Sequence, residues 1–159
     1  MELGSGRSTS WIAKRCGYLV SIESDATWHN QVNKMIREKG IKNVNYIFAP
    51  LDNNSTPTQS AYLSPLGAAP PESFDFILVD GDFRDHAALM AIPKVKSNGL
   101  LIVDNANWFL PSETKSPSSV RQNEKCKTVT WEEFNKQVSG WKKEWTSNGI
   151  TDTVFFFKP

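Results

Sequence analysis

Short apolar runs alternate with helical patterns along most of this sequence, and that alternation restricts the possible folds more than any other feature. The strand-like runs lie at 18–23, 43–48, 74–80 and 100–104. Helical patterns lie at 11–17, 26–39, 85–96 and 131–141. Strands that alternate with helices indicate a mostly parallel sheet covered on both faces. We therefore predict a Rossmann-like, doubly wound α/β fold in a single domain over residues 1–159.

The last part of the chain departs from this alternation. Two strand-like runs within 142–158 flank Asn148 and Gly149, a pair that favours a tight hairpin turn. We expect this C-terminal hairpin to join the sheet in antiparallel orientation. Segments 52–73 and 108–129 are predicted as long irregular stretches, and Asn98–Gly99 as the turn into the strand at 100–104.

The first strand of such a sheet is predicted to be truncated. Only Met1, Glu2 and Leu3 precede Gly4, whereas a strand usually has about 5 residues. In a doubly wound sheet this strand lies at the centre. Three explanations stay open: the sheet accepts a short strand, a second copy supplies pairing in a homodimer, or the sequence is a fragment of a longer protein.

Polar residues stand where the predicted strands end. Glu23 ends the run at 18–23, Asp80 the run at 74–80, and Asp104 with Asn105 the run at 100–104. In open parallel sheets, ligands bind beyond the carboxyl ends of the strands. We therefore expect these four side chains to converge on one ligand site.

A glycine loop precedes the first helical pattern. Gly4 and Gly6 allow a sharp turn and a close approach of backbone to a ligand, and Ser8 or Thr9 is expected to cap the helix. Free N–H groups at that helix start suit a carboxylate or a phosphate. Glu23 lies 19 residues after Gly4, where an acidic side chain can accept hydrogen bonds from ribose hydroxyls.

These features also suit a nicotinamide cofactor, so an NAD-dependent oxidoreductase is a competing hypothesis. Two residues argue against it. Thr9 stands where the dinucleotide pattern has glycine or alanine, and Glu2 stands two positions before the first glycine.

At this point the sequence resembles the class I S-adenosylmethionine-dependent methyltransferases. The resemblance covers nearly the whole chain and is closest to a small bacterial branch with Gly-Ser-Gly-x-Ser-Thr in the loop. It rests on segments 2–6, 21–23, 74–81 and 98–105, in the order of that family. It implies an enzyme that binds S-adenosylmethionine and methylates oxygen or nitrogen of a small molecule. The alternative is a non-catalytic domain that keeps the cofactor site.

The resemblance also assigns roles to residues. Glu2, Gly4, Ser5 and Gly6 would surround the methionine part of the cofactor, and the Ser8 and Thr9 hydroxyls would bond its carboxylate. Glu23 would hold the ribose. Ala49, Pro50 and Leu51 would flank the adenine, and Asp80 would face the sulfonium.

Asp80, Asp104 and Asn105 further resemble, more distantly, the metal ligands of catechol and caffeoyl-CoA O-methyltransferases. Mg²⁺ takes such oxygen ligands and would lower the pKa of a bound hydroxyl. The alternative is that Asp80 orients the cofactor while Asp104 and Asn105 only shape the strand end.

Arg84 and His86 follow Asp80 in the next loop. The candidate catalytic residues are Asp80, Arg84 and Asp104, with Arg84 holding an anionic substrate. The alternative is that Arg84 pairs with Asp82 or Asp85. His86 is expected to start the following helix rather than to act as a base.

Composition limits the partners. The net charge of +1 gives no general attraction to nucleic acid or membrane surfaces, so neither is expected. No apolar run approaches the roughly 20 residues of a membrane span. Two cysteines form no metal or disulfide pattern, which favours a reduced, cytoplasmic protein. The expected partner is a small-molecule substrate.

Overall fold

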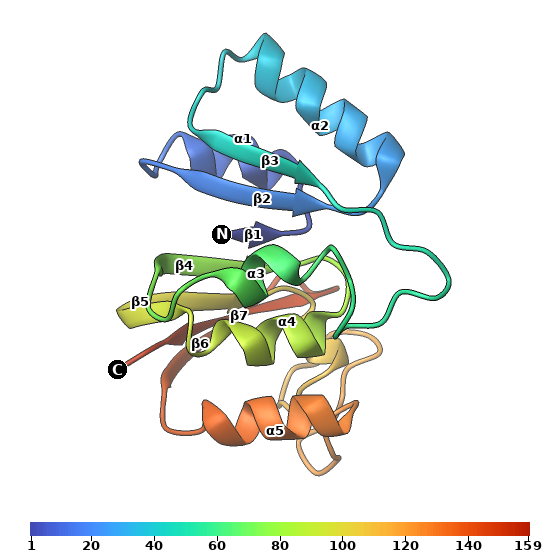
Figure 1. Cartoon of the computed structure of the whole chain (residues 1–159). Helices are drawn as coiled ribbons and strands as arrows, with labels where there is room; N and C mark the ends of the chain where they lie inside the picture. Colours follow the sequence, from blue (N-terminus) through green and yellow to red (C-terminus); the bar gives the residue numbers. More distant parts are fainter.

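The computed structural model describes residues 1–159 and contains one seven-stranded sheet with the order β3-β2-β1-β4-β5-β7-β6 (Figure 1). The strands are β1 (Glu2–Leu3), β2 (Leu19–Glu23), β3 (Val44–Phe48), β4 (Phe74–Val79), β5 (Val95–Val103), β6 (Lys142–Ser147) and β7 (Asp152–Phe157). The first five are parallel, and β7 runs antiparallel to both β5 and β6. The predicted Rossmann-like α/β fold with a C-terminal antiparallel hairpin is therefore confirmed.

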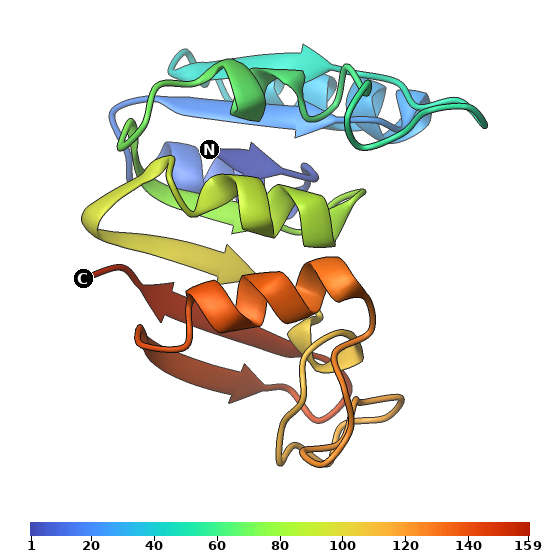
Figure 2. The ribbon, with the colours of Figure 1, turned by 60° about the horizontal axis from the view of Figure 1, so that its bottom comes forward.

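Helices cover the two faces of the sheet unequally. On one face α3 (Ser64–Ala68), α4 (Arg84–Ala91) and α5 (Val129–Gln137) lie side by side (Figure 2). On the other face α1 (Arg7–Ala13) and α2 (Ala26–Glu38) pack against the β1–β3 half. A short 3-10 helix, Ala106–Trp108, follows β5. None of the helices combines the length and the apolar character that a membrane span requires.

The main core lies between the sheet and the α3–α5 layer. Alternate residues of β4, β5 and β7 point into it, because successive side chains of a strand face opposite ways. Trp131 and Phe134 of α5 and Phe156 of β7 are all less than 2% exposed, and their rings meet edge to face at 5.3 Å. Burying these aromatic side chains contributes a large part of the hydrophobic stabilisation.

The short first strand occupies the centre of the sheet. Glu2 and Leu3 pair with β2 on one side and β4 on the other, and Leu3 is fully buried. Met1 extends the pairing, since its nitrogen donates to the Phe76 carbonyl at 2.8 Å and its carbonyl accepts from the Leu78 N–H at 3.0 Å. Short as it is, this strand satisfies backbone groups that would otherwise be buried without partners.

Several predicted boundaries were wrong. The first helix starts at Arg7 and ends at Ala13, with Gly6 rather than Ser8 or Thr9 at its N-cap. Segment 52–73 is not wholly irregular, because α3 forms there with Pro65 in its first turn. The last helix ends at Gln137 instead of reaching 141.

The largest boundary error concerns the start of β5. Helix α4 ends at Ala91, and β5 begins at Val95, not at Leu100. Asn98 and Gly99 therefore lie within β5, where Asn98 has φ 62° and the register against β4 shifts. Asparagine tolerates this left-handed conformation better than most residues, so the same pair fits a strand irregularity as well as a turn.

Candidate functional site

The glycine loop packs directly on the chain that leaves β4. Gly4 has φ 89°, and a Cβ added to it would lie 2.7 Å from the Gly81 backbone nitrogen. A side chain would therefore both strain the backbone and separate the loop from residues 80–81. Gly4 is required here because the carboxyl ends of β1 and β4 approach each other this closely.

Glu2 lies at the bottom of the loop and is fully buried. Its Oε2 accepts hydrogen bonds from the Thr9 hydroxyl at 2.7 Å and the Ser21 hydroxyl at 2.6 Å. Its Oε1 is buried and has no partner. Burial raises the pKa of Glu2. An unpartnered buried carboxylate oxygen is costly unless a donor or a cation meets it.

Thr9 points inward rather than toward a ligand. Its side-chain oxygen donates to Glu2 and accepts from the Gly6 N–H at 3.0 Å, and the residue has no exposed surface. The expected bond from Thr9 to a cofactor carboxylate is therefore not available in this structure. Ser8 instead lines the largest cavity.

Glu23, at the end of β2, closes the other side of the loop. Its Oε2 accepts from the Ser5 N–H at 3.1 Å and the Ser5 hydroxyl at 2.6 Å. Its Oε1 accepts from the N–H groups of Ser24 and Asp25, both at 2.9 Å. Of these four donors, only the Ser5 hydroxyl belongs to a freely rotating side-chain group. A ribose hydroxyl would therefore bind Glu23 in place of the Ser5 hydroxyl.

Three aromatic residues complete this region, and the motifs did not indicate them. The Trp28 indole N–H donates to the Ser5 carbonyl at 2.7 Å, and the Tyr46 and Ser5 hydroxyls share a hydrogen bond of 2.7 Å. Tyr62 is fully buried, and its hydroxyl lies so close to Gly81 that an added Cβ there would be 1.8 Å away. Burial raises the pKa of Tyr46 to about 12 and also raises that of Tyr62, so both hydroxyls remain donors.

The residues expected to flank adenine lie after β3. Ala49 is buried, and its N–H donates to the Glu23 carbonyl at 2.8 Å. Leu51 is half-buried against the main core, while Pro50 is exposed. These residues therefore border the Glu23 end of the loop.

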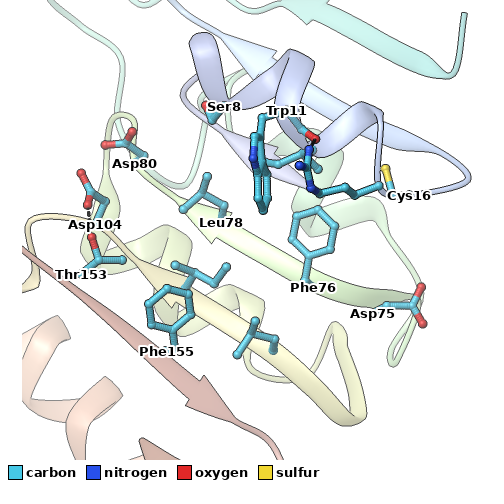
Figure 3. A pocket seen from close by; sticks show the side chains of 14 residues that line it. Ser8, Trp11, Cys16, Asp75, Phe76, Leu78, Asp80, Asp104, Thr153 and Phe155 are labelled. Atoms are coloured by element: carbon cyan, nitrogen blue, oxygen red, sulfur yellow. Dashed lines mark hydrogen bonds between the residues drawn. The ribbon is translucent and has the colours of Figure 1, made fainter. Parts of the chain in front are cut away.

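The largest cavity, about 710 Å³, lies on the sheet face opposite α3–α5. Its walls are mainly apolar, from α1, β4, β5 and β7, and include Trp11, Phe76, Leu78, Ile102 and Phe155 (Figure 3). Asp80 and Asp104 lie together at one end of it. Burial and the neighbouring Asp104 raise the pKa of Asp80 to about 7. Asp104 accepts a hydrogen bond from the Thr153 hydroxyl.

Arg84, the first residue of α4, binds the protein's own oxygen atoms. Its Nε donates to the Gly81 carbonyl at 2.9 Å. One terminal nitrogen donates to the Asp80 carbonyl and to Asp80 Oδ1 at 3.0 Å, and the other to the Asp104 carbonyl and to Asn105 Oδ1. Its partner is therefore Asp80, not Asp82 or Asp85. A guanidinium has five N–H donors, and all five are used.

This geometry corrects two expectations. Arg84 has no donor left for an anionic substrate. The magnesium interpretation is also not supported, because the guanidinium already bonds Asp80 Oδ1 and Asn105 Oδ1, and no three His, Cys, Asp or Glu side chains are grouped so that they could hold a metal ion. Two cations cannot share these oxygens without strong repulsion.

His86 lies in the first turn of α4, as expected, and its Nδ1 is 2.9 Å from Asp85 Oδ1. Of the polar residues at the strand ends, Asp80 and Asn105 bond Arg84 through their side chains, and Asp104 does so through its carbonyl. Glu23 contacts none of these three, although the neighbouring Ser24 hydroxyl donates to Asp82 at 2.5 Å. That all four side chains serve one ligand site stays a prediction.

Comparisons with known proteins address the fold. No protein-family profile and no curated protein match the sequence. Solved structures do match. A methyltransferase from Geobacter sulfurreducens superposes with a TM-score of 0.63 at 16% identity, over 99% of this chain and 69% of its own. A proposed caffeoyl-CoA O-methyltransferase from Staphylococcus aureus also has a TM-score of 0.63, at 14% identity, and the match covers 99% of this chain and 74% of that protein.

This chain has the class I methyltransferase fold. An S-adenosylmethionine-dependent methyltransferase from Aquifex aeolicus also matches, with a TM-score of 0.53 at 12% identity over 98% of this chain and 79% of its own. At such identities the likeness concerns the fold alone. What the methyltransferase fold does in this protein must be argued from its own side chains.

The side chains fit S-adenosylmethionine at the glycine loop. The unpartnered Oε1 of Glu2 is a buried anionic atom that a cationic ligand would satisfy. Glu23 offers its carboxylate to a diol once the Ser5 hydroxyl turns away. Neither of the two largest cavities is lined by Gly4, Gly6 or Glu23, and the Ser5 N–H and hydroxyl both bond Glu23 in this structure.

Tyr62→Phe tests whether the buried Tyr62 hydroxyl beside Gly81 lacks a hydrogen-bond partner. The Tyr62 hydroxyl is buried without a partner, and such a group costs about 1–3 kcal/mol. Its removal is expected to raise the free energy of unfolding by about 1 kcal/mol, measured by urea denaturation. Tyr46→Phe is the matched control and is expected to lower it, because the Tyr46 hydroxyl bonds Ser5. Equal changes of the same sign in both variants would contradict this account.

Proposed function

We propose that this protein is an S-adenosylmethionine-dependent methyltransferase that acts on oxygen or nitrogen of a small-molecule acceptor. The observation that carries the proposal is the placement of three carboxylates around one glycine loop in a methyltransferase fold. Glu2, Glu23 and Asp80 come from the neighbouring strands β1, β2 and β4, and Glu2 keeps an unpartnered oxygen. This pattern suits a ligand that carries a positive charge and a ribose.

When bound, S-adenosylmethionine would supply an electrophilic methyl group: the acceptor's lone pair would form a bond to the methyl carbon as the S–CH3 bond breaks in line, with S-adenosylhomocysteine as the leaving group. The protein contributes mainly position and electrostatics. Glu2 would bind the cationic end of the cofactor, and Glu23 would hold its ribose hydroxyls. Asp80, whose pKa is raised to about 7 by burial and by Asp104, is suited to take the proton that the acceptor loses.

The cavity beside Asp80 and Asp104 supports an acceptor with an apolar body. Its walls carry Phe76, Leu78 and Phe155, and the two carboxyl groups stand at one end. Apolar walls with a few convergent polar groups are typical of small-molecule sites. The acceptor would lie along these walls with its nucleophilic atom at the Asp80 end. A homodimer is an independent expectation that this proposal does not require.

Isothermal titration calorimetry tests the cofactor part of the proposal. We expect binding of S-adenosylmethionine and its demethylated product, S-adenosylhomocysteine, and none of NAD. Glu2→Gln is expected to weaken both sulfur ligands at least about tenfold, since it removes the buried charge. Glu38→Gln, on the exposed part of α2, is the matched control. Folded protein that binds neither sulfur compound would refute the proposal.

Turnover separates an enzyme from a non-catalytic binding domain. Purified protein with labelled S-adenosylmethionine and a panel of aromatic alcohols, phenols and amines is expected to release S-adenosylhomocysteine and methylated product. Binding without any turnover across the panel would favour the non-catalytic alternative.

A further inference from the structure

The oxygens around Arg84 form a cage that resembles a cation site in composition. Its members are three backbone carbonyls, of Asp80, Gly81 and Asp104, with Asp80 Oδ1 and Asn105 Oδ1. Hard divalent cations take such carbonyl, amide and carboxylate oxygens. Here each of these five oxygens faces one N–H of the guanidinium. The side chain of Arg84 is only 18% exposed, so this charge is held inside the site.

We propose that Arg84 is a built-in cation that takes the place of a divalent metal ion between the ends of β4 and β5. It neutralises Asp80, fixes the direction of that carboxylate, and binds Asn105, which has φ 53°. Arg84 is thus a positioning residue that acts through Asp80. The effect of Arg84 on catalysis rests on the proposed function, whereas the replacement of a metal ion by its guanidinium does not.

Because the guanidinium of Arg84 is covalently part of the chain, it cannot dissociate from the site as a metal ion can. Because Arg84 starts α4 and its partners end β4 and β5, the same contacts join a helix to two strands. A guanidinium keeps its charge at every accessible pH. It also leaves no open coordination position, unlike a metal ion that binds two neighbouring hydroxyls of a substrate. The acceptor therefore does not need a vicinal diol and is selected by the apolar walls next to Asp80.

Manganese binding tests the inference without any activity assay. The probe is Mn²⁺, followed by electron paramagnetic resonance, on the wild type, Arg84→Ala, Arg84→Lys and the double variant Arg84→Ala/Asp80→Asn. We expect no saturable site in the wild type or in Arg84→Lys, whose ammonium keeps the charge. Arg84→Ala is expected to gain one site at least about tenfold tighter than any residual wild-type binding, since it exposes the oxygen cage. Asp80→Asn in that background is expected to remove it.

A rescue measurement separates a cation role from ordinary packing. Mg²⁺ is expected to raise the thermal midpoint of Arg84→Ala and to leave the wild type unchanged, whereas a purely structural arginine would not be replaced by an ion. Arg37→Ala, an exposed arginine in the last turn of α2, is the matched control and should gain no site. Folding of each variant is checked by circular dichroism.

Two results would overturn the inference. One is a saturable Mn²⁺ site in the wild type that Asp80→Asn removes, because the cage would then be open to metal despite Arg84. The other is folded Arg84→Ala that binds no more Mn²⁺ than the wild type. If Arg84→Ala does not fold, Arg84→Gln, which also removes the charge, takes its place in both measurements: a new Mn²⁺ site supports the inference, and folded Arg84→Gln without one overturns it. Loss of the proposed methyl transfer would leave these binding results unchanged.

Discussion

Replacing Gly4 with alanine is expected to lower the free energy of unfolding by about 3 kcal/mol and to abolish binding of S-adenosylmethionine. Two causes add. Alanine at φ 89° is strained, and its Cβ would lie 2.7 Å from the Gly81 nitrogen and 2.8 Å from the Asp80 carbonyl carbon. Backbone atoms cannot rotate away as a side chain can, so the loop and the end of β4 must separate. Urea denaturation and calorimetry measure the two effects.

Gly149→Ala separates the clash from the strain. Gly149 has φ 87°, nearly the value at Gly4, but nothing lies within 4 Å of an added Cβ. This variant is expected to lose only about 1 kcal/mol, the cost of the backbone conformation, and to keep its cofactor affinity. Equal losses of stability in the two variants would show that the approach of Gly4 to Gly81 is not tight in solution.

Glu23→Gln is expected to lower the free energy of unfolding by about 2 kcal/mol and to weaken S-adenosylmethionine at least about tenfold. Glutamine has nearly the same shape, but one of its two terminal groups is an N–H donor. Whichever way the amide turns, that donor faces either the two N–H groups of Ser24 and Asp25 or the one N–H group of Ser5, beside the Ser5 hydroxyl. Buried donors then meet without an acceptor. Urea denaturation measures the free energy of unfolding, and calorimetry measures the affinity for S-adenosylmethionine.

The control is the same substitution on a surface. Glu38 is exposed in α2 and lies 3.8 Å from Lys34, an ion pair of a kind that contributes little. Glu38→Gln is expected to change both quantities only within about 0.5 kcal/mol. Unchanged cofactor affinity in folded Glu23→Gln would remove the ribose role proposed for Glu23.

Much of the fold could be predicted because it depends on periodic patterns. The alternation of apolar runs with helical patterns predicted the sheet, and Asn148–Gly149 predicted the hairpin between β6 and β7. The boundary errors arose where one pattern fits two structures. Asn98 and Gly99 suit a turn or a strand irregularity equally. Only the pairing of the flanking residues Val95 and Leu100 with Phe74 and Phe76 of β4 decides between them.

The sequence by itself determined that Glu23, Asp80, Asp104 and Asn105 stand at strand ends, because a strand's length and its last polar residue are local properties. Only the tertiary structure decided what those side chains contact. Arg84 lies 20 or 21 positions before Asp104 and Asn105, and a long flexible side chain can reach many partners. The contacts of Thr9 with Glu2 and of Tyr62 with Gly81 likewise depend on how separate segments pack together. The packing of β1 between β2 and β4 brings Glu2 and Gly4 close to the ends of the neighbouring strands. No local sequence pattern predicts such a contact between distant segments.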